Sequence, residues 1–576
     1  MKGILAILLI VITGSLLRFN SLDDRPMTHP EFYAPGLEIP EYVWTPNERT
    51  TISEVIAAPY TIHHPHLPAH DLLLLGWTHL FGTDLFSLRA SSALTGILTL
   101  LALYLFARET SNRRTALLSA AILAVHGYHV YWSQLAKQWV LLSLLGVLSA
   151  YLLARLSSRW NAGAALMYAG VCISGLWVDS YFWPIFLTQI LWVLFNDAQN
   201  KRPSLLLNVQ FISLLLAYPA LAYLLHFSDL NSHLPPDIWP RFLEMMQFGG
   251  IIIRESTIST AGPINLLIGI FGALLVVIGL VQPGNGHAYT HVSKPAAEKL
   301  VRLFMGVSVL TAPAFSFLLF RNDSLIQHNR SFYIGSLLPL LMVVCWLFLN
   351  WQWQRTTLLI NKISKNRLVR NVFSDLPATM MILPFLLLSI IHLKKPVLTP
   401  YALISLTPFF ILIASRGIFR LGRTLQYVAG TGILAVCVYS VYQSAHIENP
   451  RDYAALANVL EPEIRDGDLL LIDDKWYLTP VIYYFPPSRY ELRPTVALSR
   501  ENLLESTHNS NAGYKRFWLV DFQLSDAPNR YDLPASLKEV KRVRANNGIA
   551  ILFESDAPLH VPPDQRSYRK PSVKEQ

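Results

Sequence analysis

Long apolar runs recur along the first three quarters of the 576-residue chain, and charged residues or proline bound each of them. A helix needs about 20 predominantly apolar residues to cross a bilayer. The pattern therefore predicts a polytopic α-helical membrane protein with about thirteen transmembrane helices. We place these helices near residues 3–18, 87–107, 115–132, 138–155, 162–178, 180–196, 205–226, 264–282, 303–320, 333–351, 377–393, 400–416 and 425–442.

The composition supports this class of protein. Apolar residues make up 52% of the chain and charged residues only 15%, whereas soluble proteins carry about 25% charged residues. With 12% aromatic residues as well, the chain is neither disordered nor a solenoid. The three cysteines, Cys172, Cys345 and Cys437, all lie inside apolar runs, which excludes a disulfide framework and a cysteine metal site.

The distribution of Lys and Arg orients the predicted helices. If the N-terminus is cytoplasmic, the inside loops hold 19 of these cations in roughly 76 residues, against about 11 in roughly 136 residues outside. This asymmetry predicts a multi-pass protein of the cell inner membrane whose first loop and C-terminal tail are extracytoplasmic. Because the inside loops account for the net charge of +9, we predict no nucleic-acid partner.

The apolar run after Lys2 is short for a transmembrane helix and has the length of a signal peptide. No small-x-small cleavage site follows it, because the next residues are Arg18-Phe19-Asn20. We therefore interpret this run as an uncleaved first helix.

Three regions follow from these patterns. Residues 1–442 form a transmembrane domain, whose first outer loop, 19–86, we expect to contain juxtamembrane helices. The pattern of residues 443–560 predicts a small extracytoplasmic α/β domain, and the composition of residues 561–576 predicts a disordered tail. Within the second region we expect a helix at 452–460 and strands at 469–472, 481–485, 517–520 and 549–553.

A basic amphipathic segment, residues 351–373, lies between two predicted helices. Its composition is typical of a helix that lies along the membrane surface, here on the inner leaflet.

Carboxylates in the first outer loop are the candidate catalytic residues. Asp23, Asp24 and Glu31 follow the first helix closely and lie among aromatic residues, with His29 beside them. A carboxylate kept from bulk water at the membrane surface can act as a general base toward an acceptor hydroxyl or amine. The alternative is that these carboxylates cap and solubilise a loop.

Four histidines lie within eight residues at the far end of this loop: His63, His64, His66 and His70. They could bind a divalent metal, donate hydrogen bonds to a phosphate, or be ordinary polar loop residues. Pro65 and Pro68 interrupt the run and exclude regular i, i+4 ligand spacing. We expect no cofactor and keep a divalent cation at these histidines as the alternative.

Three motifs in fixed order resemble a known family. They are His64-Pro65-His66-Leu67, then Leu80-Phe81-Gly82-Thr83-Asp84 with Leu88-Arg89-Ala90-Ser91, then Tyr131-Trp132-Ser133-Gln134. Together they resemble the integral-membrane glycosyltransferases of the GT-C fold (glycosyltransferase family 39 type), which include protein mannosyltransferases, aminoarabinose transferases and lipopolysaccharide-core galacturonosyltransferases. The resemblance covers residues 1–160 by motif and the remainder by architecture.

The chain departs from the family pattern at three positions. Glu31 matches the Glu of the family's Asp-Glu loop motif, but Pro30 stands in place of the Asp. His66 replaces the second proline of the His-Pro-Pro-Leu motif, and Leu135 replaces a Glu. If the missing Asp is the main catalytic carboxylate, its role falls to Glu31, Asp24 or Asp23, or is lost.

The resemblance implies a donor sugar carried on a polyprenyl phosphate, with the phosphate at the outer membrane surface. Cations there would stabilise the departing phosphate, and a first-loop carboxylate would deprotonate the acceptor. The residues it suggests for binding the donor phosphate are His64, His66, Arg89, Lys137 and Arg330. The alternative for each cation is an interfacial residue whose charged end reaches water.

The sequence therefore predicts an outer-face glycosyltransferase that acts on a lipid, polysaccharide or protein acceptor of the cell envelope. No glycine-rich phosphate loop is present, as expected if no nucleotide sugar is used. Two other classes stay open: a lipid or polysaccharide flippase, and a GT-C relative that has lost activity and serves as a scaffold. Few charged residues lie within helices, Asp179 being the clearest, and this argues against a transporter.

Overall fold

The computed structural model divides the chain into two compact units. A helical unit comprises residues 1–20, 57–73 and 89–446, and a sheet-containing unit comprises 21–56, 74–88 and 447–576. The structure describes residues 2–37, 50–61, 67–198, 204–218, 220–221, 263–281, 301, 329–393, 397–398, 400–445, 452–472, 478–484, 491–494, 514–522, 537–545 and 548–559.

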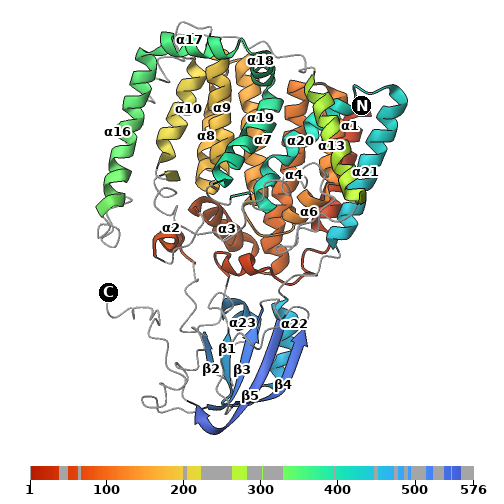
Figure 1. Ribbon diagram of the computed structural model, residues 1–576, viewed down its shortest axis with the longest axis vertical. Helices are drawn as coiled ribbons and strands as arrows, with labels where there is room; N and C mark the ends of the chain where they lie inside the picture. The colour runs from red at the N-terminus through yellow and green to blue at the C-terminus, as the bar shows by residue number, and fades with distance from the viewer. Residues whose placement is uncertain are drawn as a thin grey trace. The chain divides into compact units, whose positions relative to one another are not determined.

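Helices make up the first unit (Figure 1). Its principal helices are α1 (Lys2–Phe19), α4 (Leu85–Thr110), α5 (Arg113–Ala124), α6 (Gly127–Ser133), α7 (Trp139–Ser158), α8 (Ala162–Val178), α9 (Phe182–Asp197), α10 (Leu205–Leu216), α13 (Pro263–Val281), α16 (Asn329–Trp351), α17 (Trp353–Ile363), α18 (Arg367–Ser374), α19 (Leu376–His392), α20 (Thr407–Ile418) and α21 (Arg423–Ala445). Two helices, α2 (Ile52–Thr61) and α3 (Pro68–Phe81), lie within the stretch predicted as the first outer loop, and their juxtamembrane position stays a prediction.

Polar residues in the short connections fix several helix starts. The side chain of Asn112 accepts a hydrogen bond from the Thr115 amide at the start of α5, and Asn161 does the same for Ala164 at the start of α8. Such N-caps satisfy backbone donors that have no partner within the helix.

The prediction of one continuous helix at 115–132 is wrong. The chain forms α5 and α6 instead, and His126 caps the second helix by accepting a hydrogen bond from the His129 amide at 3.4 Å. The apolar pattern runs through this break because the residues on both sides are buried. The helix predicted at 400–416 likewise begins as a 3-10 turn, η2 (Pro400–Ser405), before α20.

Three described helices are long and apolar enough to cross a bilayer, namely α4, α7 and α21, and seven further apolar helices have shorter described lengths. The helix predicted at 303–320 lies outside the described residues. The structure thus confirms a helical protein with several apolar helices, and the number of thirteen spans stays a prediction.

The core of the helical unit lies between α4, α5, α7–α10, α19 and α20. Phe106 of α4 meets Phe409 of α20 edge to face, with ring centroids 5.8 Å apart. A buried polar chain also joins four helices, because Gln189 bonds to Tyr168 and Ser149, and Gln210 bonds to Tyr168. Hydrogen bonds between helices hold apolar helices together where no water competes.

The sheet-containing unit holds five strands in the order β2-β1-β3-β5-β4. The strands are β1 (Leu469–Ile472), β2 (Glu491–Pro494), β3 (Tyr514–Asp521), β4 (Leu537–Ala545) and β5 (Gly548–Leu559). β1 pairs in parallel with β2 and β3, whereas β5 pairs antiparallel with β3 and β4. Helices α22 (Tyr453–Leu460) and α23 (Leu478–Tyr484) complete this mixed α/β arrangement.

Two expectations for this unit need correction. Residues 481–485 were expected to form a strand, but 478–484 form α23, because a short apolar run does not distinguish a buried strand from a short buried helix. β4 was not predicted, since it is an edge strand with mostly exposed, charged side chains and shows no apolar alternation.

The first outer loop is divided between the two units. We expected it to belong with the transmembrane helices, yet residues 21–56 and 74–88 group with the C-terminal sheet. The domain boundaries at 442 and 560 stay predictions, and residues 561–576 lie outside the described part of the chain.

Candidate functional site

A cluster of buried polar residues gathers where several helices of the first unit end. It comprises His70 and Asp71 in the first turn of α3, Gln138 before α7, and Asp179 between α8 and α9. The Gln138 amide donates to Asp179 Oδ2 at 3.2 Å, and His70 Nδ1 lies 3.4 Å from Asp71 Oδ1. All four side chains are buried, so their charges and dipoles act with little screening by water.

Asp179 is held by its own turn. Its carboxylate accepts a hydrogen bond from the Tyr181 amide at 2.9 Å and another from the Ser180 hydroxyl at 3.3 Å. Burial raises the pKa of this carboxyl, and these hydrogen bonds, together with the charge of His70, oppose the rise. Asp179 is therefore a cap at the end of α8 and does not lie within a continuous helix.

Two of the cations predicted to bind phosphate, Arg89 and Lys137, lie buried in this unit. Arg89 stands in the first turns of α4 and is 1% exposed, and Lys137 stands in the turn between α6 and α7 and is 6% exposed. Ser92, almost one helical turn after Arg89, donates to the Lys137 backbone carbonyl at 3.4 Å. Burial of this degree differs from the exposed charge of a side chain that reaches out to water.

The turn that carries Lys137 and Gln138 is tied to the end of α1. The side-chain amide of Gln134 donates to the carbonyls of Leu17 and Asn20 at 3.1 and 3.0 Å. These carbonyls belong to the last turn of α1 and the residue that follows it, so one side chain both caps this end and fixes the turn.

Arg18 strengthens the same attachment from inside the helical unit. Its guanidinium is fully buried and donates to the carbonyls of Ala124 at 3.0 Å and Leu123 at 3.1 Å, and to His129 Nδ1 at 2.9 Å. These carbonyls stand at the end of α5, and the Leu123 carbonyl also accepts from the backbone amides of Val125 and His126 in the turn before α6. Gly96 of α4 gives Arg18 and Ser133 room, because a Cβ at this position would clash with both.

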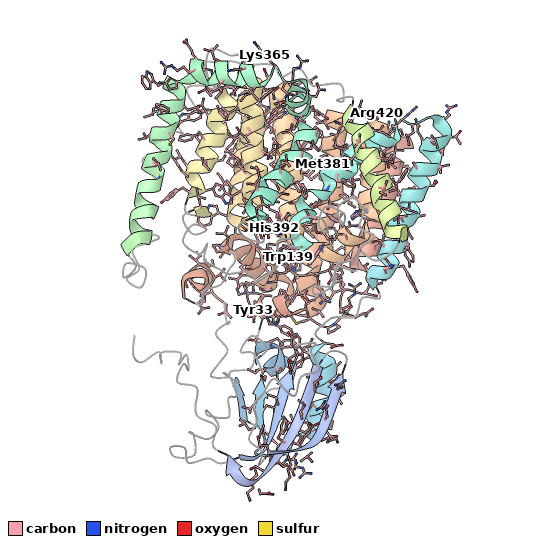
Figure 2. All side chains as sticks on the ribbon, viewed as in Figure 1. Tyr33, Trp139, Lys365, Met381, His392 and Arg420 are labelled. Atoms are coloured by element: carbon pink, nitrogen blue, oxygen red, sulfur yellow. The ribbon has the colours of Figure 1, made fainter. Side chains whose placement is uncertain are left out.

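Aromatic rings cover one side of this turn. Trp139 stacks on Tyr401 with centroids 4.6 Å apart, and Trp132 meets Trp139 edge to face at 4.6 Å. Figure 2 labels Trp139 and His392 in this part of the helical unit. Nδ1 of His392 accepts hydrogen bonds from the amides of Val397 and Leu398. With Tyr128, Leu135 and Val140, these rings form a buried apolar cluster at the turn.

The three predicted catalytic carboxylates lie in the other unit and have different surroundings. Glu31 is completely buried in η1 (His29–Tyr33), whereas Asp23 and Asp24 are exposed. Glu31 Oε2 accepts hydrogen bonds from the Thr28 amide at 2.8 Å and the Thr28 hydroxyl at 3.0 Å. This is the capping arrangement of the alternative interpretation, and it also meets the requirement that a base be kept from bulk water.

The η1 segment packs against the helices of its own unit. His29 Nδ1 lies 3.0 Å from the Tyr453 hydroxyl, and the Tyr484 hydroxyl oxygen accepts a hydrogen bond from the Met27 amide at 3.2 Å. Phe32 meets the rings of Tyr453, Tyr483 and Tyr484 edge to face. The loop that carries Glu31 is thus fixed by the C-terminal part of the chain.

The remaining predicted site residues are not fully described. His64 and His66 lie outside the described residues, and Arg330 is placed in the first turn of α16 without a described side chain. Among the described residues, no three His, Cys, Asp or Glu side chains converge in a way that could hold a metal ion.

Sequence reasoning did not propose Gln138, Asp179 or Arg18 as members of a site, and it named His70 only as one of four histidines that could bind a metal or a phosphate. Asp179 gave the clearest signal, since a carboxylate that interrupts a long apolar run is rarely accidental. Arg18 also stood at the end of an apolar run. Their partners lie tens of residues away along the chain, and no local pattern indicates such pairings.

Comparison with protein families supports the resemblance drawn from the motifs. Residues 63–223 match the family model of dolichyl-phosphate-mannose-protein mannosyltransferases. The resemblance to integral-membrane glycosyltransferases is confirmed over this segment, which contains both Arg89 and Lys137. No protein with a curated description matches the chain.

Solved structures show weaker likenesses. ArnT from Cupriavidus metallidurans in the apo state is 13% identical, with a TM-score of 0.44 over 96% of this chain and 98% of that one. The same protein bound to undecaprenyl phosphate is 12% identical, with a TM-score of 0.41 over 95% of this chain and 97% of that one. An Archaeoglobus fulgidus oligosaccharyltransferase is 11% identical, with a TM-score of 0.43 over 89% of this chain and 67% of that one. At these identities and scores, no function follows from the likenesses.

Proposed function

We propose that this protein is a membrane glycosyltransferase that transfers a sugar from a polyprenyl-phosphate donor to an acceptor at the outer face of the cell inner membrane. One observation carries the proposal. Arg89 and Lys137 are buried cations inside the segment that matches the mannosyltransferase family model. A buried cation interacts strongly with an anion because little water screens its charge, and a lipid-linked phosphate is an anion that this class of enzyme must bind.

The cations supply the stabilisation that the reaction needs. As the bond between the anomeric carbon and the phosphate oxygen breaks, negative charge accumulates on the departing polyprenyl phosphate. Lys137 and Arg89, held in a site with little water, stabilise this charge more strongly than they would in bulk solvent. Gln134 and Arg18 keep the Lys137 turn in place before the substrate arrives.

A first-loop carboxylate is proposed as the base. It takes the proton of the acceptor hydroxyl or amine, whose oxygen or nitrogen then attacks the anomeric carbon from the side opposite the phosphate, so the configuration inverts. Among Glu31, Asp24 and Asp23 we assign this role to Glu31, because it alone is withdrawn from water. The acceptor is a lipid, a polysaccharide or a protein of the envelope.

We expect Lys137→Met to lower turnover about 10²-fold, because removing one preorganised donor to a developing anion costs about this much. The assay uses purified protein in lipid with a panel of polyprenyl-phosphate sugars and candidate acceptor extracts, and measures release of free polyprenyl phosphate. Lys137→Arg retains a cation and should keep more activity. Lys365→Met, which removes an exposed cation from the connection between α17 and α18, should behave as the wild type.

The same assay separates the alternatives. Equal release by wild type and Lys137→Met would contradict the assigned role of Lys137. No release from any donor, with donor binding confirmed, would overturn the proposed enzyme and favour the scaffold or the flippase.

A further inference from the structure

The helices α17 and α18 form a surface that neither the core nor the proposed site uses. Residues 351–374 contain five Lys and Arg and no Asp or Glu. The side chains of Arg355, Lys362, Lys365 and Arg370 are exposed. We define Arg355, Leu358, Leu359, Lys362 and Lys365 as the basic surface.

The exposed cations and the exposed leucines of α17 lie on the same face of the helix. In α17, Trp353 and Thr357 are buried on one side, and Leu358 and Leu359 are 70% and 59% exposed. With 100° between successive residues, Arg355 and Lys362 fall between the two leucines on the side opposite Trp353. A face that mixes exposed leucines with lysine and arginine is unfavourable in water but suits the boundary between lipid headgroups and acyl chains.

The surface is fixed to the helical unit by its other side. Asn361 of α17 donates to the Ala198 carbonyl at 3.3 Å, just beyond the end of α9, and Asn196 of α9 donates to the Phe373 carbonyl of α18 at 3.2 Å. Phe195 stacks on Phe373 with centroids 4.4 Å apart. α17 accordingly runs across one end of α8, α9 and α10, where Figure 2 labels Lys365 (Figures 1 and 2).

We propose that the basic surface binds the headgroups of anionic phospholipids. The cations attract the phosphate and the exposed leucines enter the interface, and each cation near an anionic membrane contributes measurably to binding. No acidic side chain within 351–374 offsets this attraction, and Asp375, which follows, is buried against Arg416. The proposal does not rest on the glycosyltransferase assignment.

The test compares lipid selection by full-length variants. Purified protein in detergent is mixed with equimolar phosphatidylglycerol and phosphatidylcholine, and native mass spectrometry counts the lipids that stay bound. We expect wild type to retain phosphatidylglycerol preferentially. The triple variant Arg355→Gln, Lys362→Gln, Lys365→Gln should lower that preference about tenfold or more, because it removes three cations that attract anionic headgroups.

Two matched variants make the result decisive. Lys538→Gln, Lys541→Gln, Arg542→Gln removes the same charge from exposed positions of β4 and should keep the wild-type preference. Arg355→Lys, Lys362→Arg, Lys365→Arg preserves the charge and should also keep it. An unchanged preference in the glutamine triple, an equal loss in the β4 control, or a loss in the charge-preserving variant would overturn the proposal.

Discussion

Glu31→Gln is expected to lower the release of polyprenyl phosphate by about 10²-fold or more, because loss of a general base typically costs 10²–10⁴-fold. Glutamine has the size of glutamate and keeps a side-chain oxygen that can accept from the Thr28 amide and hydroxyl. The cap of η1 therefore survives, and only the ability to take a proton is lost.

Variants of the two exposed carboxylates serve as controls for this prediction. Asp23→Asn and Asp24→Asn should change turnover only a few-fold, since water already solvates both side chains. Thermal unfolding measured in parallel should show Glu31→Gln close to wild type and Glu31→Ala less stable, because alanine removes the cap, a loss of about 1 kcal/mol. Full activity in Glu31→Gln, with stability lost only in Glu31→Ala, would show that Glu31 is a cap and not the base.

Arg416→Met is expected to destabilise the helical unit by about 3–5 kcal/mol, because it leaves a buried charge without its partner. Arg416 Nη1 donates to Asp375 Oδ2 at 2.5 Å, its Nε to Ser111 Oγ at 2.6 Å and its Nη2 to the Thr110 carbonyl at 2.9 Å. One side chain thus joins α20 to the start of α19 and the end of α4. The nearby Arg420 donates to the carbonyls of Ile278 and Gly279 and does not replace it.

Unfolding by sodium dodecyl sulfate in mixed micelles measures the effect. Adding Asp375→Asn to Arg416→Met should restore part of the loss, since no buried charge then lacks a partner. Arg423→Met removes an exposed cation at the start of α21 and should change stability by less than about 0.5 kcal/mol. A loss in Arg416→Met no larger than in Arg423→Met would contradict the buried-pair interpretation.

The sequence by itself determined what depends on local composition. Apolar length predicted the helices at α4, α7 and α21, because burial in lipid requires a continuous run of apolar side chains whatever the tertiary fold. The strands at β1, β3 and β5 were likewise visible as short apolar runs. The motifs around Arg89 and Lys137 indicated the family that the match over residues 63–223 supports.

Only the tertiary structure decided which polar groups meet. Arg18 bonds to carbonyls more than one hundred residues away, and Gln138 bonds to Asp179 across two helices. The break between α5 and α6 also escaped the sequence, since side chains packed around it bury both helices. Hydrogen bonds and ion pairs depend on distance in space, which hydrophobic periodicity does not encode, so the partners of a buried charge become known only once the helices are packed.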